Sequence, residues 1–361
     1  MTPFRWILAV VSFAAAIGVS IYIVDTSWPA EEAKVSPSAL TQLLLLTIAL
    51  LELGARALKV RLSAAALRIP ISFGTSLRAS AGGDFGAAIT PARTGAEPAR
   101  FLIMKEAGMT AAHILLVIFA ELFLEMLTLA AVAAALFLAF RSSGPMILGM
   151  VALVAAYAAF VLGSGAIGVM LSRHHASGPP PAWFTRLGLN AGLWRRIQRS
   201  LRQLRDGIEG VRDVRWNAAV GAFAASLAHV ALRLAILPVI VYSFHRTAPL
   251  APMLLWPIAL TYGAVIAPVP AGGGAIEVGF KAALGSSIPP DIFGAALIWW
   301  RFYTFYLFVL IGAFVAGGTV LRALRTEDEH AEEDALTDAV PASASATAMR
   351  AANPAGSDRS A

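Results

Sequence analysis

The stretch AITPARTGAEPARF, residues 88–101, interrupts a strongly apolar chain with prolines, glycines and charges. The stretch VIAPVPAGGGAIEVGFK, residues 265–281, repeats its pattern, because in each an Ile-x-Pro is followed four residues after the proline by a glycine. Matched Pro/Gly interruptions in two halves of a hydrophobic chain are typical of transporter binding sites. The pattern therefore predicts two broken, re-entrant segments related by an internal repeat. Two ordinary surface loops, alike by chance, remain the alternative.

The composition indicates a membrane protein. Of 361 residues, 58% are hydrophobic and 14% are charged, against about 25% charged in soluble domains. These values exclude a soluble globule, a disordered chain and a fibre. The chain has no cysteine, which excludes disulfides and cysteine-ligated metals, and its six histidines are mostly far apart. We expect neither a metal nor another cofactor.

Seven apolar runs approach or exceed the ~20 residues that a bilayer span needs. They are Trp6–Val24, Leu40–Val60, Ala111–Phe140, Pro145–Leu171, Trp216–Phe244, Pro252–Pro268 and Phe293–Leu321. The first is too long for a signal peptide. The shorter stretches Pro70–Lys105 and Ala271–Ser287 are rich in small residues and broken by Pro and Gly. We expect an all-α, polytopic membrane helix bundle with seven or eight crossings.

The basic residues predict the orientation of this bundle. Residues 173–215 contain nine arginines and three acids, which is typical of a cytoplasmic loop. Part of this loop has the period of a basic amphipathic helix, suited either to an anionic lipid surface or to packing on the bundle. Residues 1–324 form the predicted membrane domain, and the acidic residues 325–361 a disordered tail. The basic residues lie between apolar runs without a nucleic-acid motif, so we expect no nucleic-acid partner.

Ionisable side chains recur inside the apolar runs, where each costs ~2.5–3.5 kcal/mol at a helix centre. Most are four residues apart and so share a helical face: Glu52 with Arg56, Glu121 with Glu125, His229 with Arg233, and Arg301 alone. Glu121 and Glu125 need cationic partners or bound protons. For Glu52 and Arg56 an intrahelical structural pair is favoured. Arg301 is either a counter-ion for a glutamate or a clamp for the substrate.

Four motifs carry a resemblance to a known family: residues 83–109 (GDFGAAITPARTGAEPARFLIMKEAGM), the Glu121–Glu125 helix, residues 267–280 (APVPAGGGAIEVGF) and residues 299–312 (WWRFYTFYLFVLIG). With them the chain resembles the transmembrane, flippase-like domain of lysylphosphatidylglycerol synthases, over roughly residues 40–323. It departs from the family at Ala96, often a glycine, and at Glu125, often an aspartate. The resemblance implies a lipid-translocating domain of the bacterial inner membrane. Only a short acidic tail follows Leu324, so we expect a stand-alone member without the synthase domain, which is not an enzyme.

The first functional prediction is a transporter that moves a polar-headed lipid or lipid-linked molecule between leaflets. No ATP-binding motif is present, so transport would be passive or ion-coupled. The N-terminal ends of the helices that follow Gly95 and Gly272 would bind phosphate oxygens. The predicted substrate-binding residues are Pro91, Gly95, Glu97, Arg100, Glu121, Glu125, Pro268, Gly272, Glu277 and Arg301.

Two other functions remain open from the sequence. Paired carboxylates and arginines also suit a membrane enzyme acting on a lipid-linked sugar or phosphate, although no nucleophile constellation accompanies them. A structural partner of lipid-synthesis enzymes is the other alternative.

Overall fold

The computed structural model describes residues 36–90, 93–140, 144–174, 214–263, 274–316 and 318–319, together with residues 18, 22, 194, 198 and 202. Their regular structure is helical, without a strand in these ranges. The helices are α2 (Ala39–Ala66), α3 (Phe73–Ala88), α4 (Ala96–Glu106), α5 (Ala111–Ala139), α6 (Gly144–His174), α9 (Trp216–Ser243), α10 (Leu250–Gly263), α11 (Ala275–Leu284) and α12 (Pro290–Arg301). A π-helical turn, η2 (Phe302–Tyr306), follows α12 and leads into helix as far as residue 316. The predicted all-α class is confirmed for this part of the chain.

Local sequence signals start and stop these helices. The Ser72 and Thr110 hydroxyls accept hydrogen bonds from backbone N–H groups of the first turns of α3 and α5, which satisfies donors that helix ends leave unpaired. Gly108, at φ 86°, stops α4, as glycine commonly does after a helix. Helix α2 continues beyond Val60, where the predicted span ended, to Ala66, so Lys59 lies inside the helix and not at its end.

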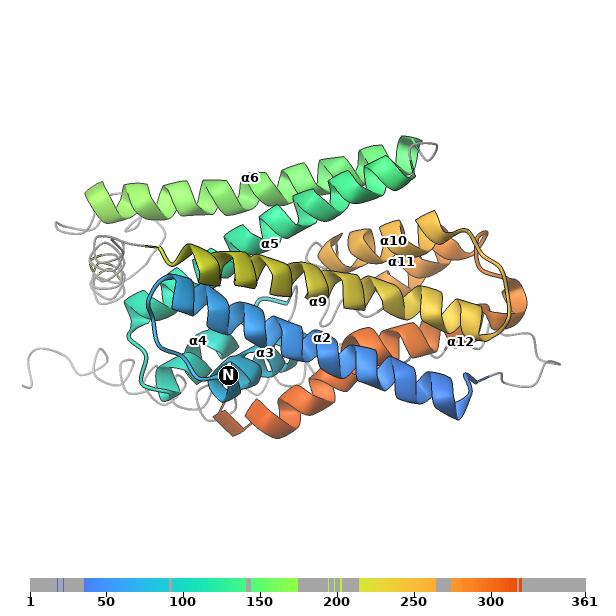
Figure 1. The fold of residues 1–361 in the computed structure, drawn as a ribbon, viewed down its shortest axis with the longest axis horizontal. Coiled ribbons are helices and arrows are strands. Elements are labelled where there is room, and N and C mark those ends of the chain that lie inside the picture. Colours follow the sequence, from blue (N-terminus) through green and yellow to red (C-terminus); the bar gives the residue numbers. More distant parts are fainter. Residues whose placement is uncertain are drawn as a thin grey trace, which may run out of the picture.

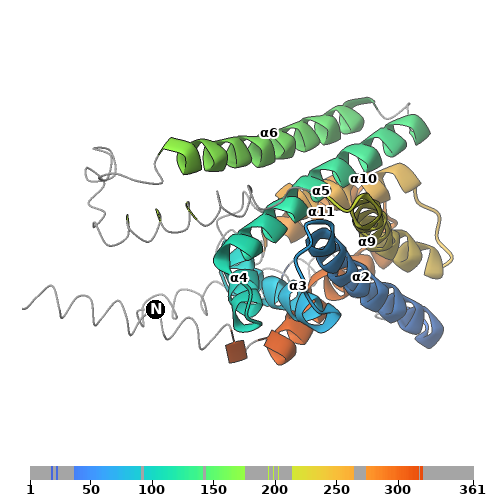
Figure 2. The ribbon, with the colours of Figure 1, turned by 60° about the vertical axis from the view of Figure 1, so that its left-hand side comes forward.

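Helices α2 and α9 form the central pair of the bundle. They run side by side (Figure 1), and the Arg215 N–H, just before α9, donates to the Ala66 carbonyl at the end of α2 over 3.0 Å. The two helices are therefore antiparallel. Helices α5 and α6 pack together along one side of this pair (Figure 2).

Side chains on the outside of the bundle are largely apolar. Leu43, Leu138, Phe160 and Phe314 are among the most exposed large hydrophobic residues, at 60%, 61%, 66% and 94%. Buried positions, in contrast, include charged side chains such as Glu52. This distribution is the reverse of that in a soluble bundle and fits a lipid-facing surface.

Two apolar clusters lie at different levels of the bundle. Along α2, Leu45 and Leu53 belong to the first cluster, with α9, α11 and α12. Val60 belongs to the second, with α4 and α5. Along α2, Arg56 and Lys59 fall between the two clusters; we call these residues, with the charged groups that they pair with, the charged layer.

Three helical stretches among the described residues are long and apolar enough to cross a membrane: Ala111–Ala139, Trp216–Ser243 and Pro290–Ala316. A membrane protein is therefore supported, while the count of seven or eight crossings stays a prediction. The expected span Trp6–Val24 and the amphipathic loop 173–215 lie almost wholly outside the described residues, and the tail 325–361 lies wholly outside them.

The first broken segment is a tight hairpin of α3 and α4. A Cβ on Gly86 would lie 2.4 Å from the Gly95 carbonyl oxygen, a distance that excludes any larger side chain. The Thr90 hydroxyl donates to the Gly86 carbonyl and accepts from the Gly95 N–H, both over 2.8 Å. Glycine and threonine thus fix the turn at the predicted interruption.

The second broken segment, predicted at Ala271–Ser287, contains α11, which packs against α10. Residues 264–273, which join them, lie outside the described residues. Helix α11 starts from Gly274, whose φ is 78°, in the region that favours glycine. Both α4 and α11 thus begin after a glycine and carry a glutamate in the first turn, Glu97 and Glu277. The repeat itself stays a prediction.

Candidate functional site

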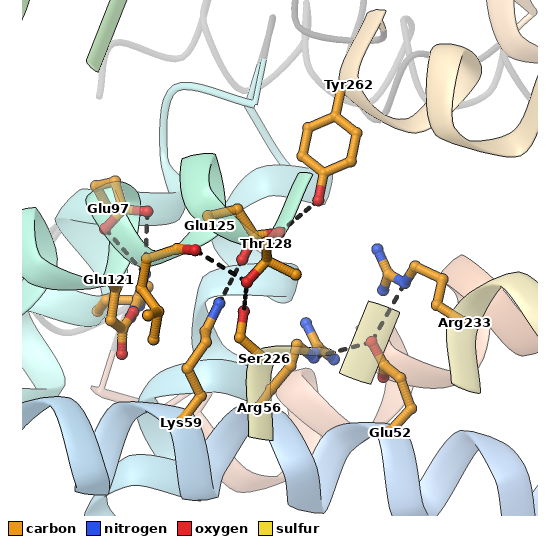
Figure 3. A network of polar contacts seen from close by, with 12 residues as sticks. Glu52, Arg56, Lys59, Glu97, Glu121, Glu125, Thr128, Ser226, Arg233 and Tyr262 are labelled. Atoms are coloured by element: carbon orange, nitrogen blue, oxygen red, sulfur yellow. Dashed lines mark hydrogen bonds and ion pairs between the residues drawn. The ribbon is translucent and has the colours of Figure 1, made fainter. Parts of the chain in front are cut away.

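The two glutamates of α5 point into the bundle, where each meets a cation (Figure 3). Arg100 on α4 donates to Glu121, and its other terminal nitrogen lies 3.1 Å from a carboxylate oxygen of Glu97. The Lys59 ammonium lies 2.6 Å from the Glu125 carboxylate, which also accepts from the Tyr262 hydroxyl. The like-charged pair of α5 therefore has the cationic partners that the sequence required.

Glu52 joins two arginines from different helices. Its side chain is fully buried, and one carboxylate oxygen lies 3.2 Å from Nε of Arg56 and 3.2 Å from Nε of Arg233 on α9. Arg56 also reaches Asp84 on α3 at 2.8 Å. The expected intrahelical pair is present, but it is one part of a network that links α2 to α9 (Figure 3) and, through Asp84, to α3.

Arg301 pairs with Glu277 at the start of α11. The Arg301 Nε donates to a Glu277 carboxylate oxygen over 2.9 Å, and the other oxygen accepts from the Gly274 N–H over 2.8 Å. The guanidinium carbon of Arg301 also lies 4.6 Å from the centre of the Phe305 ring. The geometry favours the counter-ion interpretation of Arg301 over a free clamp.

A hydroxyl pair joins α5 to α9 close to this network. The Thr128 hydroxyl donates to the Ser226 hydroxyl over 2.8 Å, and both side chains are buried. Such interhelical hydrogen bonds contribute about 0.6 kcal/mol on average in membrane proteins. The charged layer therefore continues as a polar contact between two helices that are long enough to span a bilayer.

Several buried atoms of the network keep unused hydrogen-bonding capacity within the described part of the chain. They include both carboxylate oxygens of Glu52, Nε and Nη2 of Arg56, Oδ2 of Asp84, Nε of Arg100, Oε1 of Glu121 and Nε of Arg233. The ion pairs above bring these groups close together without aligning all of them as hydrogen bonds. Each such group costs about 1–3 kcal/mol, and native proteins contain few of them. Their clustering here favours a site that binds a polar ligand.

Two cavities open onto the network. The larger, of about 150 Å³, is lined by Arg56, Lys59, Val60, Ser80, Gly83, Asp84, Arg93, Ala96, Glu97, Arg100 and Glu121. The smaller is lined by Asp84, Arg93, Arg233, Thr261, Ile276, Trp300, Arg301, Thr304, Phe305 and Phe308. Asp84 and Arg93 line both cavities. In the smaller one, these two residues of the first broken segment lie with Ile276 of the second and with Thr261 of α10.

The predicted site residues divide into three groups. Glu97, Arg100 and Glu121 line the larger cavity, and Arg301, bonded to Glu277, lines the smaller one. Gly95 shapes the α3–α4 turn. Glu125 pairs with Lys59, which lines the larger cavity, but does not line the cavity itself. Pro91, Pro268 and Gly272 lie outside the described residues. The roles of all ten in substrate binding stay predictions.

The helix ends offer less to an anion than the sequence suggested. The Gly95 N–H donates to Thr90, the Ala96 N–H to the Arg93 carbonyl, and the Gly274 N–H to Glu277. These donors at the starts of α4 and α11 already have acceptors. The cationic side chains of the cavities are better placed to meet a negative charge.

Sequence reasoning missed four residues of the network as site candidates: Lys59, Asp84, Arg93 and Tyr262. Asp84 and Arg93 lie inside the quoted motif of residues 83–109, and an aspartate among small apolar residues is the same costly signal as Glu121. Lys59 was missed because the predicted second span ended at Val60, which placed it at a helix end, where a basic residue is ordinary. Tyr262 had no signal, since tyrosine is common at helix ends.

The carboxylates of this network meet cations and do not converge on one another. Across the described ranges, no group of three histidine or acidic side chains could hold a metal ion.

The family described as the lysylphosphatidylglycerol synthase TM region matches residues 6–312. A search of curated proteins found no match.

Proposed function

Because the chain belongs to the lysylphosphatidylglycerol synthase TM region family, we propose that it moves a polar-headed lipid or lipid-linked molecule between the leaflets of a bacterial inner membrane. One observation carries the proposal: a bundle with an apolar exterior contains two charge-lined cavities, and both broken segments contribute to the smaller one.

The position of the charges along the helices supports this function. Glu52 lies at the middle of α2 and Glu125 at the middle of α5. At 1.5 Å per residue these helices are about 40 Å long, so both carboxylates lie about 20 Å from either end. That depth is where a lipid headgroup meets the greatest barrier in the ~30 Å hydrocarbon core. A polar interior at this level offers the headgroup charged and hydrogen-bonding partners, which the acyl chains of the bilayer do not.

The network also suits exchange of partners. Each carboxylate of the α5 pair faces a single close cation, Glu121 with Arg100 and Glu125 with Lys59. A headgroup that carries both a phosphate and a hydroxyl or amine could replace one contact with another of similar strength. Ion pairs of comparable strength before and after exchange keep the barrier low, as passive or ion-coupled transport requires.

The proposal contains no covalent step, so the transported lipid leaves with unchanged mass. Anionic lipid at the cytoplasmic surface and lipid-synthesis enzymes are the proposed partners. The basic loop 173–215 would contact the anionic lipid, and the enzymes would supply the lipid that is moved.

Reconstitution in liposomes tests the function. Headgroup-labelled lipid in the inner leaflet should reach an impermeant quencher outside faster than in protein-free vesicles, with its mass unchanged. Glu121→Gln and Arg301→Gln should each slow this movement at least about tenfold, on the scale of one charged hydrogen bond. Arg246→Gln is the matched control, because Arg246 is 53% exposed and pairs with Asp291 outside the network.

Thermal unfolding of each purified variant shows whether it is still folded. Unchanged lipid movement in both folded variants would refute the assignment of the site. A product of altered mass would favour the enzyme, and no movement by wild-type protein with retained partner enzymes would favour the structural role.

A further inference from the structure

Arg93 differs from every other cation of the two cavities. The other five each have a carboxylate within ion-pair distance: Arg56 with Asp84, Lys59 with Glu125, Arg100 with Glu121, Arg233 with Glu52 and Arg301 with Glu277. Arg93 makes neither a hydrogen bond nor an ion pair through its side chain with any residue of the described ranges. It is nevertheless half-buried and lines both cavities.

The backbone at Arg93 adds a second cost. Its φ is 58°, in the left-handed region that disfavours side chains with a Cβ. Arg68 and His245 share this conformation, but each directly follows the cap of a helix, where it is an ordinary way to end one. Arg93 instead precedes α4. Strain held at a cavity, in a turn before a helix and not at a helix C-terminus, points to a function for the side chain.

The neighbours of Arg93 are mostly positive. Asp84 is the one carboxylate that lines the same two cavities, and Arg56 already binds it. Arg56, Arg233 and Arg301 add cationic groups around Arg93. Nη2 of Arg56 and Nε of Arg100 are buried donors without an acceptor in the described ranges. Glu97 and Glu121 also line the larger cavity, but both pair with Arg100. Among the described lining residues, cations therefore outnumber carboxylates in both cavities, and unused donors lie among them.

We propose that Arg93, with Arg56 and Arg100 beside it, is a binding site for a phosphate-type oxyanion, and that in the membrane this anion is the phosphodiester of a lipid headgroup. The planar guanidinium group matches two phosphate oxygens at once. A cavity of about 150 Å³ has room for several waters, each of about 30 Å³ in the liquid, and so admits a phosphate group. The lipid part of the proposal rests on the proposed function, whereas the anion site rests on the cluster alone.

Native mass spectrometry of the purified full chain tests the site. The probes are phosphatidylglycerol and, with the same acyl chains, diacylglycerol, which lacks the phosphate. Arg93→Gln should weaken retention of phosphatidylglycerol about 10- to 100-fold and leave retention of diacylglycerol unchanged. Arg93→Lys should keep part of the binding, since it keeps the charge. Arg246→Gln, at an exposed arginine, should bind as wild type does.

Inorganic phosphate distinguishes the source of the anion. If phosphate alone raises the Tm of the wild type but not of Arg93→Gln, and phosphatidylglycerol is not retained, the oxyanion site stands and its lipid assignment falls. If Arg93→Gln does not fold, Arg93→Gly replaces it, because glycine removes both the charge and the backbone strain.

Equal retention of phosphatidylglycerol by the wild type and a folded Arg93 variant would overturn the proposal, and so would equal loss in the Arg246 control. The binding assay is independent of translocation. If binding depends on Arg93 but no lipid moves between leaflets, the proposed function is refuted and the anion site stands. If lipid moves but binding does not depend on Arg93, the anion site is refuted and the proposed function stands.

Discussion

Lys59→Met removes the cationic partner of the Glu125 carboxylate in the charged layer. The Lys59 ammonium lies 2.6 Å from Glu125, and the two side chains are 10% and 12% exposed. With an effective dielectric constant of about 20, two unit charges at that distance attract by about 6 kcal/mol before desolvation is subtracted. Removal of one partner from a buried pair typically costs 3–5 kcal/mol, because the other charge is left uncompensated. At about 2 °C per kcal/mol, Lys59→Met should lower the Tm by roughly 5–10 °C.

A double-mutant cycle with Glu125→Gln shows whether this loss belongs to the pair. The double variant removes both charges, so it should be more stable than the sum of the single losses predicts, by roughly 2 kcal/mol. Thermal unfolding of the detergent-purified chain, followed by tryptophan fluorescence, gives the four Tm values. The exposed Arg246–Asp291 pair is the control cycle and should couple by less than about 1 kcal/mol. Additive losses at Lys59 and Glu125 would refute the reasoning.

Three further predictions follow from single contacts. Gly86→Ala should lower the Tm markedly, because its Cβ would meet a backbone oxygen at 2.4 Å. Gly54→Ala, which has open space around it, should leave the Tm equal or higher, because alanine favours a helix more than glycine does. Equal effects at both positions would contradict the close packing of α3 on α4. Arg93→Gly should keep or raise the Tm while phosphatidylglycerol retention is lost, and a fall of several degrees would show that Arg93 stabilises the fold. Thr128→Val should lower the free energy of unfolding by about 1 kcal/mol, because the hydrogen bond to Ser226 is lost. Since the bond is already gone, the folded double variant Thr128→Val/Ser226→Ala should be no less stable than Thr128→Val, and a further loss of stability would contradict this account.

The helical elements were largely predictable from the sequence. Apolar runs of span length placed α5, α6 and α9 within a few residues of their observed ends, since a lipid environment requires such runs. The predicted end of α2 was wrong by six residues, because the span was ended at Val60, where the apolar run meets Lys59 and Arg61, whereas the helix continues to Ala66. A positively charged side chain is as compatible with a buried ion pair as with a helix end, and hydropathy does not separate the two.

The candidate site was predictable in kind but only partly in its members. Glu121 could be singled out because a carboxylate at the middle of an apolar helix needs a partner, and that partner is Arg100. Which cation meets which carboxylate depends on how α2, α4 and α5 pack, which the spacing along one helix does not encode. Arg93 was missed for a different reason. Its distinguishing features are a backbone angle and the lack of a partner among the described residues, and neither is visible in a sequence.

The π-helical turn η2 has a consequence for how chains of this kind can differ in length. A π turn holds one residue more than the α turn it replaces. The helical segments before and after it therefore keep the same sides turned toward the bundle interior. Arg301 on one side and Phe308 on the other thereby remain directed to the same smaller cavity. Deletion of a single residue within 302–306 should convert the turn to a regular α turn and spare both faces. In pairwise alignments with homologous chains, an isolated one-residue gap is therefore expected in this pentapeptide, whereas one elsewhere in α12 would turn half of the helix away from its partners.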